Sequence, residues 1–276
     1  MVNRKELDPE RSANAALGAL LRSLRDKRGW TQDELAALMG CSGAHISAVE
    51  TGRRSPTDAF AAKADRALGS GDRLQRQSRA ARYTALLEGF PQYVKHEERA
   101  SEIRLYEVGV IPGLLQTPEY AATLEADAVR RGAITPEQAA ERVALVAQRQ
   151  TALVRTPTPS LFAVLDEGCL LRPMGGPAVM AAQFDRLLEF AEQPNTVFQI
   201  APFQMGERRP FSLPVTILTM PDRALMSYAE SAQHGHLERN NTLVLPLLTA
   251  YHQLQAEALS QAASVATIRK LRKGIL

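Results

Sequence analysis

The sequence predicts two structural parts, an all-α N-terminal part of five short helices followed by a mixed α/β (α+β) C-terminal domain. The first prediction rests on apolar residues at helical spacing between capping residues over the first 82 positions. The second rests on strand-like and helix-like segments that alternate from residue 103 onward. We place a first domain at residues 1–71, a helical connector at 72–95 and a second domain at 96–276.

The charge of the chain is unevenly distributed. Residues 1–82 carry 15 Lys and Arg against 10 Asp and Glu, and the remainder carries 18 against 20, so the net charges are +5 and −2. A basic excess in one part of a chain favours contact with nucleic acid there, although a solvated helix face would have the same composition.

The composition also bears on location. The chain has 276 residues and two cysteines, begins with a polar segment, and contains no apolar run of about 18–20 residues. We expect a cytoplasmic, nucleoid-associated protein with free thiols and no membrane span.

Capping and stop residues divide the first part into its helices. The residues that start or end them are Gly29, Thr31 with Glu34, Gly40, Ser42, Gly52, Thr57 and Gly69. The second and third helices are short and joined by a tight turn that begins at Gly40, where glycine allows a left-handed backbone. This is the helix-turn-helix pattern, in which one helix crosses the phosphate backbone and the next enters the major groove. A helical bundle without a ligand would share these features.

Specific residues distinguish the two possibilities. Over Leu17 to Leu68 the chain resembles the XRE/Cro-type helix-turn-helix of phage repressors and many bacterial regulators. The resemblance is carried by Leu24-Arg25, Arg28-Gly29-Trp30-Thr31-Gln32, Glu34-Leu35-Ala36, Ile46-Ser47, Glu50, Gly52, Arg54 and Pro56. It implies double-stranded DNA as a partner. Glu50 is expected to cap a helix or pair with an arginine inside the domain, and Trp30 to pack between helices.

The resemblance implies DNA contacts at the helix starts and just after the third helix. Gln32 would contact phosphate at the N-terminus of the second helix. The full expected set is Gln32, Ser42, Gly43, Ala44, His45, Ser47, Arg53 and Arg54. Gly43 and Ala44 offer no bidentate donor pair, so specificity would rest on His45, Ser47, DNA shape or another segment.

The second domain, residues 96–276, is predicted to contain a sheet and several helices. Strands are expected at 103–108, 161–166, 196–200, 213–220 and 225–229, and helices from about 119, over 135–154, 179–191, 241–259 and 264–271. One right-handed βαβ unit and one hairpin on the same sheet follow from this order. We expect no enzymatic activity, cofactor or metal site, because no nucleophile, base and orienting group can be assembled from the spacing. The only metal-like cluster is Glu230, His234, His236 and Glu238, in a segment expected to face solvent.

A second resemblance covers this part. The residues that carry it are Ile111 to Ala121, Arg149-Gln150, Leu165-Asp166-Glu167, Arg172-Pro173, Gly175-Gly176, Pro202-Phe203, Tyr228, Glu230 and Ala258-Leu259-Ser260. They are similar to the C-terminal domain of a large family of antitoxin-like regulators in high-G+C bacteria. The block at 112–117, Pro-Gly-Leu-Leu-Gln-Thr, is its most specific element. The resemblance implies a regulator whose gene commonly lies beside one for a small partner protein.

Together these observations predict a homodimeric, sequence-specific transcriptional regulator. Its third helix would read an inverted-repeat operator. Its second domain would dimerise the chain and respond to a partner or effector. One alternative is an antitoxin-like protein that binds a small cognate protein encoded next to it. Another is a metabolite-sensing repressor, with a pocket formed by Tyr106, Gln116, Tyr120, Arg149 and Tyr228. The same five residues could instead form a structural hydrogen-bond network.

Overall fold

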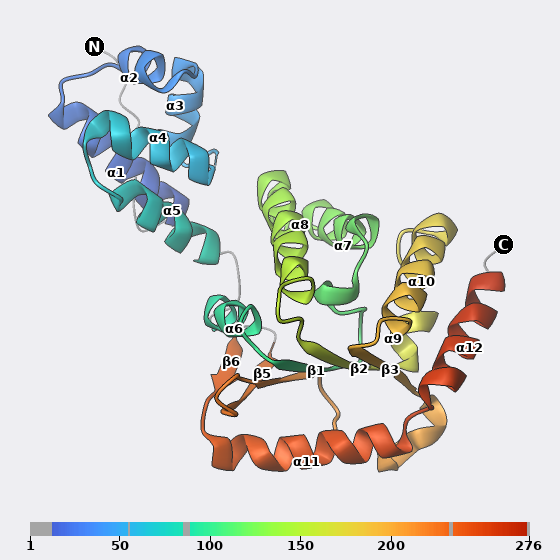
Figure 1. Cartoon of the computed structure of the whole chain (residues 1–276). Coiled ribbons are helices and arrows are strands. Elements are labelled where there is room, and N and C mark those ends of the chain that lie inside the picture. Colours follow the sequence, from blue (N-terminus) through green and yellow to red (C-terminus); the bar gives the residue numbers. More distant parts are fainter. Residues whose placement is uncertain (1–12, 55, 85–88, 232–233, 275–276) are drawn as a thin grey trace. The chain divides into compact units, whose positions relative to one another are not determined.

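The computed structural model describes residues 13–54, 56–84, 89–231 and 234–274. It divides into two compact units, residues 1–86 and 87–276, each with its own hydrophobic core (Figure 1). The first unit is helical and the second combines helices with a six-stranded mixed sheet, which confirms the predicted fold class.

The first unit consists of the five predicted helices. They are α1 (Ala13–Lys27), α2 (Gln32–Met39), α3 (Gly43–Glu50), α4 (Asp58–Leu68) and α5 (Arg73–Thr84). Ser42 and Thr57 cap α3 and α4 as predicted, each accepting a backbone hydrogen bond from the third residue of its helix. The core joins all five helices through Leu17, Leu21, Leu35, Ala36, Met39, Ile46, Val49, Phe60, Ala64, Leu68 and Leu74.

The segment predicted as a connector is divided between the two units. Leu74 of α5 is buried in the core of the first unit, where Asp65 accepts the backbone N–H groups of Leu74 and Gln75 at the start of the helix. Tyr93 and Val94 belong to the core of the second unit instead. The predicted boundaries at 71 and 95 therefore differ from this division, because both flanking segments bury apolar side chains. Residues 85–88 of the predicted connector lie outside the described residues.

The second unit is built on a sheet with strand order β3-β2-β1-β4-β5-β6. The strands are β1 (Glu102–Glu107), β2 (Ser160–Asp166), β3 (Thr196–Ala201), β4 (Val215–Thr219), β5 (Leu225–Glu230) and β6 (Gly235–Glu238). The first three are parallel and the last three antiparallel, with β1 and β4 meeting in the middle. The sequence predicted one βαβ unit, whereas the sheet holds two in succession, β1 to β2 and β2 to β3. The predicted hairpin is β4–β5, and β6 was missed because it is short and polar.

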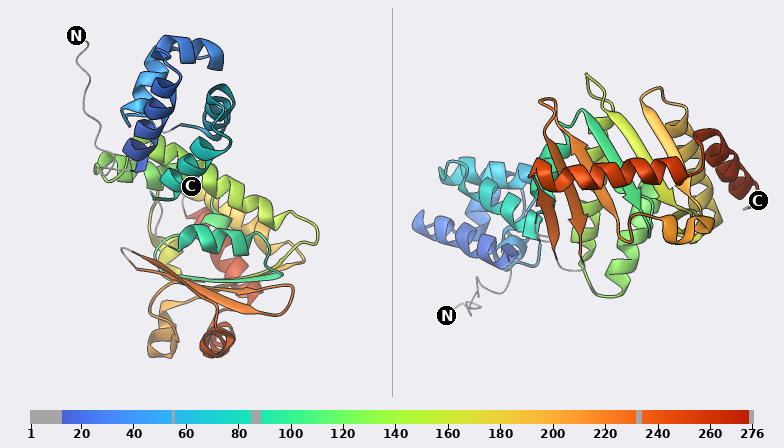
Figure 2. Two further views of the ribbon diagram at one scale, coloured as in Figure 1. Left: turned by 90° about the vertical axis from the view of Figure 1, so that its left-hand side faces the viewer. Right: turned by 90° about the horizontal axis from the view of Figure 1, so that it is seen from below.

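Helices cover both faces of the sheet (Figures 1 and 2). One face carries α6 (Phe90–Glu97), α7 (Pro118–Arg130), α8 (Pro136–Gln150), α9 (Glu167–Leu171) and α10 (Pro177–Ala191), with α12 (Gln261–Lys273) packed beside α10. The opposite face is crossed by α11 (Asn241–Glu257). Short 3₁₀ turns complete the unit at η1 (Gly113–Leu115), η2 (Thr151–Leu153) and η3 (Phe203–Arg208).

The two faces have separate cores because successive strand residues alternate in direction. Ile103 and Leu105 of β1 pack with the helices of the first face, whereas Tyr106 packs with α11. No helix among the described residues is long and apolar enough to cross a membrane.

Candidate nucleic-acid interface

The predicted motif is formed by α2, a tight turn and α3. Thr31 Oγ1 accepts the N–H of Glu34 at 3.1 Å and Glu34 Oε2 accepts the N–H of Thr31 at 2.6 Å, which is the predicted capping box. This second hydrogen bond holds the pKa of Glu34 below its usual range. Gly40 ends α2 with φ 66° and ψ 44°, the left-handed conformation expected of it.

A buried ion pair joins α1 to α3. Arg25 Nε donates to Glu50 Oε1 at 2.6 Å and Nη2 donates to Oε2 at 3.0 Å, and Glu50 is fully buried. Gln32 Nε2 of α2 donates to the same Oε2 at 2.7 Å, and Arg25 Nη1 donates to the carbonyl of Trp30 at 2.6 Å. Glu50 raises the pKa of Arg25 further, so the guanidinium stays charged. The expectation that Glu50 pairs with an internal arginine is confirmed.

Gly18 allows the backbones of α1 and α3 to approach closely. A Cβ at this position would lie 2.6 Å from the carbonyl oxygen of Val49 and 2.4 Å from that of Glu50. Only glycine fits such a contact without a shift of one helix against the other. No local pattern in the sequence indicates this role, because Gly18 lies inside a regular helical pattern.

The N-terminal turn of α3 presents small side chains to solvent. Ser42 and Ala44 are exposed, and Gly43 and Ser47 are half-buried. A Cβ on Gly43 would lie 1.8 Å from Asp33 Oδ1, so the Asp33 carboxylate occupies the space beside the start of α3. Asp33 was not among the predicted interface residues.

His45 is held against α4. Its ring centroid lies 4.8 Å from that of Phe60, and the residue is half-buried. Burial and the charge of Arg54 both lower the pKa of His45. The imidazole is therefore neutral at pH 7 and has one donor and one acceptor nitrogen.

The remaining predicted contacts lie at the two ends of the motif. Gln32 is half-buried and oriented by Glu50, which leaves one amide hydrogen and the backbone N–H groups of the α2 N-terminus for a phosphate. Arg53 and Arg54 are exposed just after α3, and Arg53 Nε donates to Thr51 Oγ1 at 2.9 Å. The structure places the predicted residues at the start of α2, on and just before α3, and in the segment after it. Their contacts with DNA stay a prediction.

Comparisons with known families agree with this geometry. The model of a helix-turn-helix domain matches residues 16–78, and that of a domain of unknown function, DUF5753, matches residues 90–270, about two thirds of the chain. The chain belongs to the DUF5753 family. No curated protein matches it, and no solved structure does. The helix-turn-helix match supports a DNA-binding function for the N-terminal unit, whereas the DUF5753 match assigns no activity.

The five pocket residues predicted in the DUF5753 domain do not converge on one site. Tyr106 faces α11, whereas Tyr120 and Tyr228 lie in the core on the other face of the sheet. Each of the other four has a partner within the domain. Gln116 Nε2 donates to the carbonyl of Ile111 at 2.7 Å, Tyr120 Oη accepts the N–H of Ile111 at 3.3 Å, Arg149 binds Glu97, and Tyr228 Oη donates to Glu230 Oε1 at 2.8 Å. For these four residues, the contacts agree with the alternative interpretation stated above, in which they form a structural hydrogen-bond network.

A charged cluster in the DUF5753 domain was missed. Arg149 Nε and Nη2 each donate to Glu97 at 2.8 Å, and Tyr93 stacks on Tyr228 with centroids 4.3 Å apart. Burial and the charge of Glu230 raise the pKa of Glu107 to about 8. The i, i+4 spacing of Tyr93 and Glu97 on one helix was the available signal, but the predicted boundary after residue 95 separated the two residues.

The His-containing segment forms no metal centre in the described part of the chain. His236 Nε2 lies 3.7 Å from Glu238 Oε2, and no group of three or more His, Cys, Asp or Glu with metal-binding geometry occurs among the described residues.

Proposed function

We propose that the protein is a homodimeric, sequence-specific transcriptional regulator whose α3 reads the major groove of an inverted repeat. In this proposal the DUF5753 domain dimerises the chain and transmits regulation by a partner or effector. Two copies related by a two-fold axis would contact half-sites about 10 base pairs apart, or a multiple of that distance.

The main observation that supports the proposal is that the N-terminus of α3 is exposed while its C-terminal end is held rigidly against α1 and α2. The buried Glu50 at the other end of α3 is bonded to α1 and α2, so the recognition helix cannot rotate independently of them. Rigid elements hold contact groups more accurately than loops do. Arg53 and Arg54 then supply exposed cations where α3 ends.

The side chains support a division between positioning and reading. Arg53, Arg54 and the N-terminus of α2 would bind phosphates and set the register on the duplex. Gly43 and Ala44 would allow close approach, with the Ala44 methyl group against a thymine methyl. Ser47 and the neutral imidazole edge of His45 would provide hydrogen bonds to bases.

The antitoxin-like alternative is supported by the resemblance of the DUF5753 domain to regulators of that kind. It makes restraint of a small cognate protein the main function and DNA binding a feedback step. Purification of the tagged chain from the cells that naturally produce it distinguishes the regulator from the antitoxin-like protein. The antitoxin-like function requires the product of the adjacent gene to co-purify in stoichiometric amount. The metabolite-sensing alternative has less support, because Gln116 and Tyr120 bond to the backbone of Ile111, and Arg149 and Tyr228 bond to the carboxylates of Glu97 and Glu230.

Mapping of bound DNA across the genome tests the proposed function. The wild-type chain should occupy discrete sites that share an inverted repeat, and Ala44→Glu should abolish that occupancy by adding a negative charge at the α3 start. Ser23→Glu, on the exposed side of α1, adds the same charge away from α3 and should leave occupancy unchanged. Uniform, sequence-independent occupancy by the wild type would contradict the proposal. Repeating the map after deletion of the adjacent gene shows whether its product alters binding.

A further inference from the structure

The start of α3 lacks a side chain that distinguishes one base pair from another. Gly43 has no side chain, and that of Ala44 is a methyl group. Ser42 Oγ accepts the N–H of His45 at 3.2 Å, as the cap of the helix. The N-terminal residues of a recognition helix are the ones that contact base edges. A polar group that reads the sequence at this point therefore has to come from another element.

The carboxylate of Asp33, on α2, lies at this point. A Cβ on Gly43 would lie 1.8 Å from Asp33 Oδ1 and 3.0 Å from its Cγ, so the carboxylate occupies the place where a side chain of Gly43 would begin. Asp33 is exposed and is the second residue of α2. Gly43 has no positive φ, in contrast to Gly40, so no unusual backbone conformation requires glycine there. The missing side chain makes room for the carboxylate.

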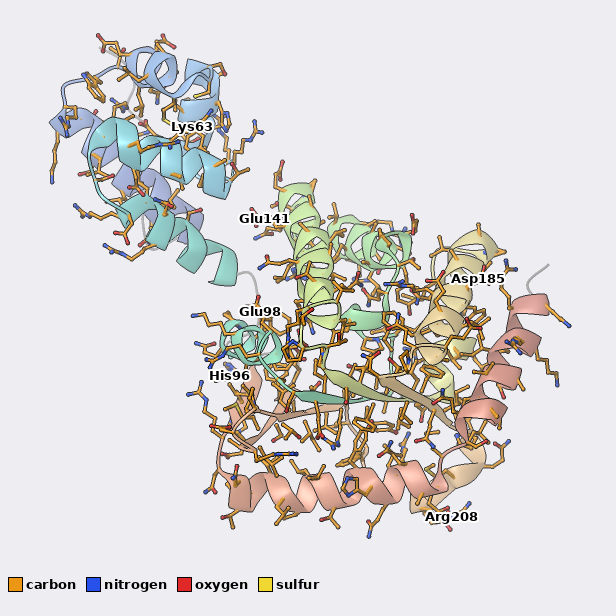
Figure 3. All side chains as sticks on the ribbon, in the orientation of Figure 1. Lys63, His96, Glu98, Glu141, Asp185 and Arg208 are labelled. Carbon is orange, nitrogen blue, oxygen red and sulfur yellow. The ribbon has the colours of Figure 1, made fainter. Side chains whose placement is uncertain are left out.

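The Asp33 carboxylate has no partner in the described part of the chain. Exposed cations such as Lys63 on α4 are present in the unit (Figure 3), but none of the described residues forms a hydrogen bond or ion pair with it. The adjacent Glu34, in contrast, accepts both the N–H and the hydroxyl of Thr31. A negative charge in the first turn of α2 is favourable by itself, but that role requires no contact with Gly43.

We propose that the Asp33 carboxylate reads a base pair at the start of α3, by accepting a hydrogen bond from the N4 amino group of a cytosine in the major groove. This inference rests on the proposed function and names one base that the unit reads. A carboxylate only accepts hydrogen bonds, so it favours amino groups and is repelled by guanine N7 and O6 and by thymine O4. Adenine carries the acceptor N7 beside its amino group, which suits Asn or Gln better than Asp.

The charge of Asp33 also acts on the phosphates. The N-terminus of α2 is proposed to bind a phosphate, and a carboxylate beside it weakens that contact on every sequence. A group that lowers general affinity and forms a hydrogen bond with one base raises the ratio of specific to non-specific binding. We therefore expect Asp33→Ala to bind unrelated duplexes at least as tightly as the wild type, and to lose about tenfold in preference for the operator. A purely structural role would weaken binding to both kinds of duplex.

The bases that the full chain enriches from a random duplex pool test this contact. Asp33→Asn keeps the size of the side chain and adds donor hydrogens, so it should replace cytosine by adenine at one position of each half-site and leave the other positions unchanged. Asp72→Asn is the matched control, because Asp72 pairs with Arg76 at the surface, and it should keep the wild-type preference. If the wild type enriches an inverted repeat and Asp33→Asn enriches the same one, the role of Asp33 is overturned and the regulator is not. A wild type that enriches no sequence contradicts the proposed function, and this inference with it.

Gly43→Ala provides a second test that leaves the charge unchanged. The added methyl group displaces the carboxylate, which is the end of a flexible side chain. Fluorescence anisotropy with two operators that differ only at the cytosine position measures the preference. Gly43→Ala should reduce this preference in the wild-type background and have no effect on it in the Asp33→Ala background. An equal reduction in both backgrounds, or none in either, would overturn the proposed contact. Retained binding to an unrelated duplex shows that each variant is folded.

Discussion

The guanidinium of Arg25 donates two hydrogen bonds, of 2.6 and 3.0 Å, to the fully buried carboxylate of Glu50. The two residues are 25 positions apart, and their contact fixes the angle between α1 and α3. Gln32 adds a bond from α2 to the same carboxylate. The orientation of the helix proposed to read DNA therefore depends on a carboxylate that is fully buried inside the unit.

Replacement of Glu50 by Gln should destabilise the N-terminal unit by about 3–5 kcal/mol, because the buried guanidinium of Arg25 loses its ion pair with Glu50 and keeps only the one with Asp26. Trp30 is the only tryptophan of the chain and lies in this unit, so its fluorescence during urea unfolding reports the change. Asp72→Asn serves as the control. Asp72 pairs with Arg76 at the surface, and its loss should cost less than about 1 kcal/mol. Equal effects of the two substitutions would show that the buried pair is not what supports α3.

Gly18→Ala should destabilise the same unit by about 1–3 kcal/mol, because the added methyl group meets the carbonyl oxygens at the end of α3. Helix propensity alone predicts the opposite sign, a gain of about 1 kcal/mol. Ser23→Ala, at an exposed position of α1, measures that propensity effect without a contact. A stabilised Gly18→Ala protein in urea unfolding would contradict the close approach of α1 and α3.

The helical unit could be predicted from sequence because its signals are local. Thr31 with Glu34, Gly40 and Ser42 each determine a helix end through their own backbone contacts. Gly18 and Asp33 could not be found in this way, because their roles depend on residues brought near by tertiary packing. The motif includes Arg25 and Glu50, and the sequence predicted that Glu50 caps a helix or pairs with an arginine inside the domain without identifying Arg25 as the partner.

Arg54→Ala should weaken binding to all DNA sequences alike and reduce the slope of log K against log salt by about 1, since one phosphate contact is lost. His45→Ala should instead change the preference among sequences, because the imidazole edge is proposed to contact a base. Binding measured by fluorescence anisotropy at several salt concentrations distinguishes the two effects. If neither substitution changes binding, α3 and its flank are not the reading surface.

Glu107→Gln should stabilise the DUF5753 domain more at pH 9 than at pH 5. The pKa of Glu107 rises from about 4.3 in the unfolded chain to about 8 in the fold, through burial and the charge of Glu230. Between these values the unfolded chain loses the proton that the folded chain keeps, so the carboxyl destabilises the fold increasingly up to about pH 8. The variant lacks this titration, and its advantage should grow by up to about 4 kcal/mol between pH 5 and pH 9, at about 1.4 kcal/mol per pKa unit.

Thermal unfolding monitored by circular dichroism at each pH measures the advantage of Glu107→Gln. Glu98→Gln, at an exposed position of the same domain, is the matched control. An advantage that is constant from pH 5 to 9 would contradict the raised pKa.

The strands of the DUF5753 domain were largely predictable, and its side-chain sites were not. Runs such as Leu161 to Leu165 are apolar enough to indicate buried strands, but the strand order depends on contacts between distant segments. Period-2 alternation puts Tyr106 on one face and Tyr228 on the other only once the register of β1, β4 and β5 is known. This is why five residues proposed for one pocket lie on both faces of the sheet.

Selection of duplexes from a random-sequence pool by the purified full chain tests the central claim most directly. We expect the wild type and Ser23→Glu to enrich an inverted repeat, and Ala44→Glu to enrich none. Enrichment of the same sequences by Ala44→Glu, or of none by the wild type, would contradict a reading role for α3.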